Sequence, residues 1–387
     1  MTLNLQLSNM IFYYFCKVSM KRLLFTFGFL PMILNAQKYQ GIQVNLLPGF
    51  LIAHREYMAN MEAHSFGLEL NYSSNYTGWS QADQGYKNLL WGTGLTYFNM
   101  GNRNLNGNVL AWHIHVEANL KKREKFQAAL KFGSGIGYLD RPYNLETNKK
   151  NKAIGSKLNG NMQIMYKAYF DLNKKTSLVL GAGVTHYSNG NFKRPNLGIN
   201  MLHMDFGLLR KIKFIDDKKS KNLKTLFPRS GFEIVAGYAR KQIAVADTRF
   251  FNVYSTSLIY YFRHNNNRNW RMGTEVFFDK TYPYTLFNEA SLKGVKAKDI
   301  TELAIKVGHE FMFGRLAIVT DLGTYLYRPN DYKKRVYFAI GFNYCFGKGI
   351  VAQTRLKSHM AVADYFYWGA AYRFNPFKNL VPLPYKY

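Results

Sequence analysis

The chain has 387 residues, among which Lys and Arg outnumber Asp and Glu by 52 to 23, so its formal net charge is +29 at pH 7. Only two cysteines occur, Cys16 near the N-terminus and Cys345, which excludes a scaffold held by several disulfides. A strongly basic chain attracts polyanions. Because the N-terminal segment indicates export, we expect no nucleic-acid partner and favour the anionic head groups of membrane lipids; charge that only aids solubility is the alternative.

The N-terminus has the pattern of an export signal. Met20-Lys21-Arg22 is basic, residues 23–34 are apolar, and Ala36 is a small residue at the cleavage point. A membrane anchor is the alternative, but the run is shorter than the roughly 20 apolar residues of a spanning helix, and Pro31 interrupts it. We expect residues 1–36 to form a leader and signal peptide, with Met20 as an alternative start of the chain.

Alternation of polar and apolar residues with period two recurs from Gly41 to Phe374. In 108–119, for example, Trp112 and Ile114 alternate with His113 and His115. Such runs exceed the usual strand of about five or six residues and are typical of an all-β, antiparallel transmembrane barrel of the outer membrane, with its apolar face toward lipid. The alternation predicts about sixteen strands, at 41–54, 62–73, 88–98, 107–120, 124–140, 160–172, 175–188, 198–211, 230–242, 251–263, 268–280, 302–312, 315–326, 335–345, 349–358 and 364–374.

The connections between these strands differ in length. Short ones, such as Asn173-Lys174 and Phe313-Gly314, follow even-numbered strands, whereas long ones, such as 141–159 and 281–301, follow odd-numbered strands. Two connections after even-numbered strands, 74–87 and 212–229, break this rule. Short turns on the periplasmic side and long loops outside are the habit of outer-membrane barrels. We expect one large barrel; an eight-stranded barrel followed by a second β unit is the alternative.

The segment 212–229 is basic and lies at mid-chain, so it is expected to connect two halves. The predicted domains are therefore the leader at 1–36, a first barrel half at 37–211, the basic connection at 212–229 and additional C-terminal strands at 230–387.

The strand that ends in Thr185-His186-Tyr187-Ser188-Asn189 carries the residues that point to chemistry. Leu180 and Val184 share a face with His186 and Ser188, because alternate residues of a strand share a face. A serine hydroxyl is a poor nucleophile unless a base takes its proton, and His186 lies on the same face roughly 7 Å away. A structural role is the alternative for a bare His-x-Ser pair.

Two amide side chains complete the candidate site. Asn200 lies on the same face of the next strand and is expected to hold the His186 imidazole in the required tautomer. Asn189, or the backbone N–H groups around it, is expected to stabilise an oxyanion. These residues predict acyl transfer to water on a substrate that arrives from the lipid side.

His186-Tyr187-Ser188-Asn189, followed by Pro195-Asn196-Leu197-Gly198-Ile199-Asn200, resembles the signature of the outer-membrane lipid A 3-O-deacylases of PagL type and of their large relatives, the acyloxyacyl hydrolases. The resemblance covers 175–210 and, loosely, the first eight strands. It implies a lipid-facing barrel esterase that removes an ester-linked acyl chain from lipid A of lipopolysaccharide, with Ser188 as nucleophile and His186 as base.

Two departures from this family stand out. The family's triad acid is a glutamate, and Asn200 occupies that position; an amide can still orient a histidine, although it stabilises imidazolium less. Asp205 is a weaker candidate because its parity places it in the lumen. The chain is also about twice as long as an eight-stranded barrel requires.

We expect Lys193, Arg194 and Asn196 to bind substrate, the two cations through lipid A phosphates, with ordinary loop charge as the alternative. His113, His115 and Glu117 share a lumen face, where polar lining is expected rather than a metal. His309 is expected to be a rim or packing residue. No cofactor is expected, and the expected partners are lipopolysaccharide and other outer-membrane lipids, with a homodimer as an option. The rival functions are a non-catalytic porin or structural barrel with a decayed site and, less favoured, a phospholipase.

Overall fold

The computed structural model describes residues 38–75, 89–123, 125–215, 230–265, 267–286, 295–329, 334–360 and 362–376. These residues form two closed barrels of eight antiparallel strands each. The predicted leader at 1–36 and most of the basic connection, 216–229, lie outside the described residues.

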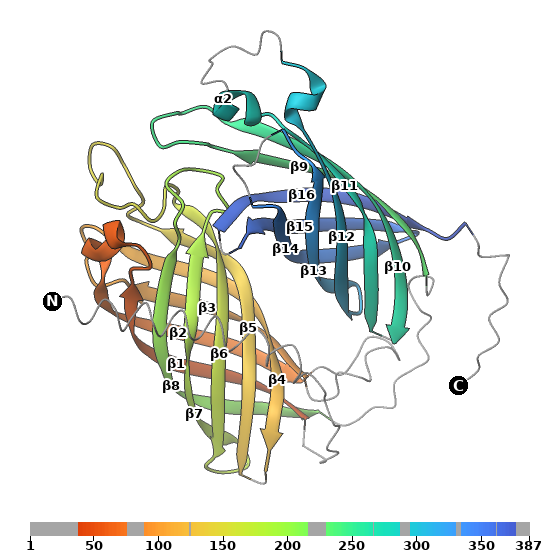
Figure 1. The fold of residues 1–387 in the computed structure, drawn as a ribbon. Helices are drawn as coiled ribbons and strands as arrows, with labels where there is room; N and C mark the ends of the chain where they lie inside the picture. Colours follow the sequence, from red (N-terminus) through yellow and green to blue (C-terminus); the bar gives the residue numbers. More distant parts are fainter. Residues whose placement is uncertain are drawn as a thin grey trace, which may run out of the picture. The chain divides into compact units, whose positions relative to one another are not determined.

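The first barrel contains β1 to β8, each paired with its neighbours in chain order, and β8 pairs with β1 to close it (Figure 1). Its strands are β1 Lys38–Ile52, β2 Ala63–Asn75, β3 Leu89–Asn99, β4 Asn108–Lys122, β5 Phe126–Leu139, β6 Leu158–Asp171, β7 Thr176–Ser188 and β8 Ile199–Ile215. A short 3₁₀ helix, Glu56–Met61, lies in the connection between β1 and β2.

The second barrel contains β9 to β16 and is closed by the pairing of β16 with β9. Its strands are β9 Ser230–Lys241, β10 Phe251–Asn265, β11 Arg268–Asp279, β12 Thr301–Phe313, β13 Leu316–Tyr327, β14 Val336–Gly347, β15 Ile350–His359 and β16 Val362–Phe374. The helix α2, Tyr282–Leu286, and a 3₁₀ helix, Ala297–Ile300, lie in the connection between β11 and β12.

The described residues confirm the sixteen predicted strands, with bounds that differ by a few residues. The single large barrel is wrong, and the alternative of an eight-stranded barrel followed by a second β unit is correct. The physical reason is that alternation tells which face of a strand is apolar but not which strand closes the sheet. Closure here depends on the β1–β8 and β9–β16 ladders, whose partners are far apart in sequence.

Side chains alternate between a buried lumen and an exposed outer surface, as the dyad pattern predicts. In β6, the outward residues Met162, Ile164 and Tyr166 are exposed, whereas Gln163 and Lys167 are buried in the lumen. Apolar residues are thus on the outside and polar ones inside, the reverse of a water-soluble fold. This is the arrangement of a barrel that has lipid as its solvent.

The lumen of the first barrel has a polar part and an apolar part. Lys131 pairs with Glu69 at 2.8 Å, and Lys167 lies 3.6 Å from Glu117 and 3.9 Å from Asp205. Closer to the end of β7 and the start of β8, an apolar cluster fills the interior. Its members are Leu47, Leu51, Met58, Met61, Phe98, Met100, Leu105, Val109, Ala111, Leu139, Ala153, Ile154, Tyr187, Ile199 and Met201.

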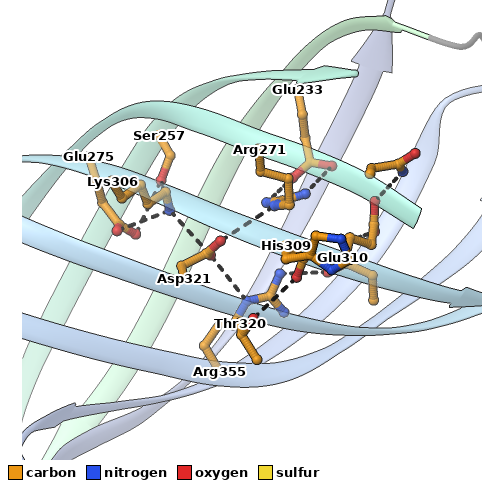
Figure 2. A network of polar contacts seen from close by, with 12 residues as sticks. Glu233, Ser257, Arg271, Glu275, Lys306, His309, Glu310, Thr320, Asp321 and Arg355 are labelled. Atoms are coloured by element: carbon orange, nitrogen blue, oxygen red, sulfur yellow. Dashed lines mark hydrogen bonds and ion pairs between the residues drawn. The ribbon is translucent and has the colours of Figure 1, made fainter. Parts of the chain in front are cut away.

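The lumen of the second barrel is filled by a network of charged side chains, part of which Figure 2 shows. Arg271 lies between Glu233, at 2.9 Å, and Asp321, at 3.5 Å. Arg373 contacts both Glu233, at 2.5 Å, and Glu310, at 2.7 Å. Charges that are removed from water are costly unless paired, so these pairs account for the many ionisable groups in this interior.

In the part of the chain that the structure describes, no helix has the length and apolar character needed to cross a membrane.

Candidate active site

The candidate residues lie where β7 ends and β8 begins, at one end of the first barrel. The connections at that end are long: 53–62, 100–107, 140–157 and 189–198. At the opposite end, the connections 123–125 between β4 and β5 and 172–175 between β6 and β7 are short, whereas 76–88 between β2 and β3 is longer. In outer-membrane barrels, long connections are typical of the extracellular side, where lipid chains meet polar head groups.

His186, Ser188 and Asn200 all face outward. In β7, Thr185 and Tyr187 are buried in the lumen, whereas His186 and Ser188 are half-buried on the outer surface. Asn200 is flanked by buried Ile199 and Met201. Tyr187, Ile199 and Met201 belong to the apolar cluster of the lumen, so the packed interior anchors the backbone that presents the three polar side chains to the outside.

The clearest contact of the site joins His186 and Asn200, which are paired across β7 and β8. His186 Nδ1 and Asn200 Oδ1 are 2.7 Å apart. An amide oxygen only accepts hydrogen bonds, so Nδ1 carries the proton and Nε2 of a neutral ring has a free lone pair. This is the tautomer that a general base needs.

Ser188 has a different partner. Its Oγ accepts a hydrogen bond from the backbone N–H of Gly190 at 3.4 Å, and within the described site no hydrogen bond joins it directly to His186. Both side chains lie on the outer face of one strand, two residues apart. In substrate-free enzymes, the hydrogen bond between a nucleophile and its base is often long, and it tightens only when substrate binds.

The chain leaves β7 through a tight turn at Asn189-Gly190-Asn191-Phe192. Phe192 N donates to Asn189 O at 3.2 Å, and φ is positive at both central residues, 59° for Gly190 and 67° for Asn191. Positive φ at both positions is the mark of a type I′ turn, which favours Gly and Asn there. The turn places the Gly190 N–H beside the Ser188 hydroxyl.

Asn189 uses its hydrogen bonds to hold the surrounding loops together. Its Nδ2 donates to Ser156 Oγ at 2.8 Å and to Lys193 O at 2.7 Å, and its backbone N–H donates to Asn196 Oδ1 at 2.9 Å. The Asn189 side chain and Asn196 therefore stabilise the loop next to Ser188. Lys193 is exposed and Arg194 half-buried in the same loop.

Gly198 allows the loop to pass close to the His186 ring. Its φ is +84°, and a Cβ built there lies 2.4 Å from His186 Cε1 and 3.1 Å from Nε2. Any larger residue would be strained in this conformation and would push the imidazole aside. The glycine in the motif is thus tied to the position of the His186 ring.

The neighbouring strand β6 leaves an open place beside the serine. Gly160 pairs with Ser188, and Met162 pairs with His186, both on the outward face. A Cβ at Gly160 meets only Ser188 O at 3.4 Å and Gly135 O at 3.9 Å. On the outer surface, the position across from Ser188 on β6 therefore carries no side chain.

His54, which follows β1, also contacts the site, although no sequence pattern points to it. Asn200 Nδ2 lies 3.1 Å from His54 Nδ1, and β1 pairs with β8 so that Ile52 stands opposite Asn200. A loop histidine has no periodic pattern to mark it. The only signal available was its place just after the first strand, which becomes adjacent to the site once β1 closes on β8.

The other candidate residues lie in the lumen or elsewhere. His113, His115 and Glu117 face inward; His115 Nε2 is 3.1 Å from Ser73 Oγ. Asp205 also faces inward, 3.1 Å from His203 Nδ1. No group of three or more His, Cys, Asp or Glu side chains suited to a metal ion occurs among the described residues. His309 packs against Trp270 on the outer face of the second barrel, with ring centroids 4.9 Å apart.

Comparisons with solved structures return outer-membrane barrels. Neisserial surface protein A is 8% identical, with 46% of this chain and 100% of that chain covered and a TM-score of 0.32. The outer membrane enzyme PagL is 18% identical, with 43% and 97% covered and a TM-score of 0.31. A mutant porin of Rh. blastica is 10% identical, with 87% and 100% covered and a TM-score of 0.16. No curated protein matches the chain in sequence.

Two family models match the chain, one for each barrel. The model for lipid A 3-O-deacylase (PagL) matches residues 64–208, and the model for the C-terminal domain of acyloxyacyl hydrolase matches residues 230–376. The first match contains His186, Ser188 and Asn200, and the two together span most of the described strands. The chain belongs to the family of PagL-type outer-membrane lipid A 3-O-deacylases and acyloxyacyl hydrolases.

Proposed function

We propose that the chain is an esterase that removes an ester-linked acyl chain from lipid A of lipopolysaccharide, with Ser188 as nucleophile and His186 as general base. Family membership and the β-barrel fold indicate the bacterial outer membrane and a deacylase activity. The observation that carries the finer proposal is the outward-facing His186, held by Asn200 in the tautomer of a base, beside a hydroxyl on the same strand face.

The reaction proceeds in two steps. His186 Nε2 takes the proton from Ser188 Oγ as the oxygen attacks the ester carbonyl, and the protonated imidazole returns that proton to the departing sugar oxygen, leaving an acyl group on Ser188. His186 then takes a proton from a water as that water attacks the acyl carbon, and it returns the proton to Ser188 Oγ as the acyl–oxygen bond breaks and the fatty acid leaves. The hydroxyl and imidazole return to their starting states, so no other reactant is consumed.

The N–H of Gly190 is the donor we assign to the oxyanion. It lies 3.4 Å from Ser188 Oγ, so an oxygen on the carbon bonded to Oγ forms within its reach. Asn189 then acts through the backbone that it fixes rather than through its amide. The exposed Lys193, in the same loop, is available for a lipid A phosphate.

The test is the loss of fatty-acid release when the nucleophile is removed. Ser188→Ala is expected to lower deacylation of purified lipopolysaccharide by at least about a thousandfold, while the barrel still folds, because the side chain is small and on the outer surface. Mass spectrometry of lipid A and of phospholipids measures the product and separates this activity from that of a phospholipase.

The matched control is Ser134→Ala. Ser134 also faces outward and is paired with Met162, which in turn is paired with His186, so it lies at the same height of the barrel wall. It is expected to keep full activity. Unchanged lipid A acylation by the wild-type chain, or equal activity of the Ser188→Ala variant, would contradict the proposal.

A further inference from the structure

An asparagine in place of a carboxylate creates a problem of orientation. A carboxylate presents two equivalent acceptor oxygens, but an amide has one acceptor end and one donor end. If Asn200 turned its Nδ2 toward His186 Nδ1, the imidazole would have to place its proton on Nε2 and would lose the lone pair that faces the serine. Something must keep the oxygen of Asn200 on the side of His186.

His54 meets this requirement. Asn200 Nδ2 lies 3.1 Å from His54 Nδ1 while Asn200 Oδ1 lies 2.7 Å from His186 Nδ1. When His54 Nδ1 is unprotonated it accepts a hydrogen bond, so it selects the donor end of the amide. Asn200 is then held between two imidazoles with only one orientation that satisfies both.

The loop before β8 offers the His54 ring a backbone acceptor. The backbone of Leu197 hydrogen-bonds with the His54 ring and acts to raise its pKa, as an acceptor does for a ring N–H. With Nδ1 accepting from Asn200, Nε2 carries the proton that such an acceptor requires. The path therefore runs from the Leu197 backbone through His54 and Asn200 to His186, with each donor facing an acceptor.

The charge state of His54 also suits this part. Partial burial, more than any other cause, lowers the pKa of His54 below its usual value, and the nearby Arg55 and His186 lower it further. The ring is consequently neutral at neutral pH, and its Nδ1 remains an acceptor. His54 lies in the connection after β1, outside the strands.

We propose that His54 is a positioning residue of this esterase, which orients the Asn200 amide so that His186 keeps the tautomer of a base. The inference rests on the proposed function, since it assigns a part to His54 through His186 and Ser188. Closure of the barrel brings the residues together: His54 and Asn200 are 146 residues apart in sequence.

The experiment compares two backgrounds. In the native background, His54→Phe removes the acceptor and is expected to lower kcat on lipopolysaccharide about tenfold or more, with a small change in KM, because a wrong imidazole tautomer is costly to a general base. His54→Gln offers an amide oxygen as acceptor and is expected to restore most of the loss.

In the Asn200→Glu background, a carboxylate accepts from His186 whichever oxygen it presents. There, His54→Phe is expected to change kcat by no more than about twofold, so that the two substitutions are strongly coupled in a double-mutant cycle. A merely structural role of His54 would cost the same factor in both backgrounds, and that result would overturn the proposal.

A measurement without turnover keeps this inference separate from the proposed function. Nitrogen-15 spectra of the folded, histidine-labelled full chain report the tautomer of His186, identified by its loss in His186→Gln. The wild-type chain is expected to show the Nδ1-protonated form, and His54→Phe a shift toward the Nε2-protonated form. If the wild-type chain releases no fatty acid, the proposed function fails, yet these spectra still decide the part of His54.

The matched control is His64→Phe. His64 is exposed at the start of β2 and packs edge-on against Phe50 at 5.2 Å between ring centroids. It lies at the same end of the barrel, but among the described residues no hydrogen bond joins it to Asn200. It is expected to leave both kcat and the His186 spectrum unchanged; a tautomer that is insensitive to His54→Phe would overturn the inference.

Discussion

At the residue scale, Gly198 shows how the backbone of a loop sets the place of a side chain in the site. Its φ of +84° lets the loop before β8 pass close to the His186 ring.

A substitution of Gly198 tests whether this close approach to the His186 ring matters for activity. Gly198→Ala adds a Cβ that would stand 2.4 Å from His186 Cε1, in a backbone with φ of +84°. We expect the imidazole to be displaced and fatty-acid release to fall roughly tenfold or more, since small misplacements of catalytic groups are costly. Release of fatty acid from lipopolysaccharide measures the effect, and the electrophoretic shift of the heated barrel measures folding.

Gly347→Ala separates strain from displacement. Gly347 also has a positive φ, 103°, but a Cβ there meets nothing within 4 Å. It should show a similar cost in stability, of about 1 kcal/mol or more, without the loss of activity. If both variants lose activity equally, the contact between Gly198 and His186 has no part in the reaction.

The parity of single side chains decides how much of the site the sequence can predict. Alternation alone places His186, Ser188 and Asn200 on one outward face, and the structure has them there. The hydrogen bonds of Asn189 and the contact of His54 could not be predicted, because both depend on the path of loops, which have no period.

At the element scale, strands were predictable and their closure was not. Each strand of the two barrels carries its own alternating pattern, which is why the bounds of β7, predicted at 175–188 and found at Thr176–Ser188, agree closely. The partner of β8 is β1 and that of β16 is β9, yet nothing in their alternation distinguishes these pairings from a continuous sheet of sixteen strands. The basic segment 212–229, which joins the two halves in sequence, gave the only hint of two separate barrels.

The outward face of β6 offers a test of how substrate approaches. Gly160→Leu fills the open place paired with Ser188 and should fold normally, because a Cβ there has ordinary contacts only. We expect the added side chain to block the acyl chain, so that kcat/KM for lipopolysaccharide falls by about tenfold or more, the order of effect expected when a reacting group is held out of place.

A control substitution adds the same bulk elsewhere. Ala352→Leu enlarges an exposed, outward side chain on β15 of the second barrel and should leave kcat/KM unchanged. Undiminished activity of Gly160→Leu would show that the acyl chain reaches Ser188 by another route, for example over β8.

At the scale of the whole molecule, the two barrels share one design: an apolar exterior around a packed, charged interior. Each barrel has buried ion pairs with less than 3 Å between nitrogen and oxygen: Lys131 with Glu69 in the first barrel, and Arg271 with Glu233 in the second. A water-filled channel would leave its lining exposed, whereas these side chains are almost wholly buried. The described interiors are therefore unlike those of porins, which hold an aqueous channel.

A sealed interior predicts no steady conductance. Purified chain in planar bilayers should show no lasting current steps at any salt concentration, because ions have no continuous water path past groups such as Lys167 and Arg373, both buried in their lumens. The same preparation should release fatty acid from lipopolysaccharide, which guards against misfolded material. Two results together would instead favour a porin, which the basic, strand-rich sequence also allowed. One is stable, salt-dependent conductance of both the wild-type chain and Ser188→Ala, and the other is no release of fatty acid by the wild-type chain.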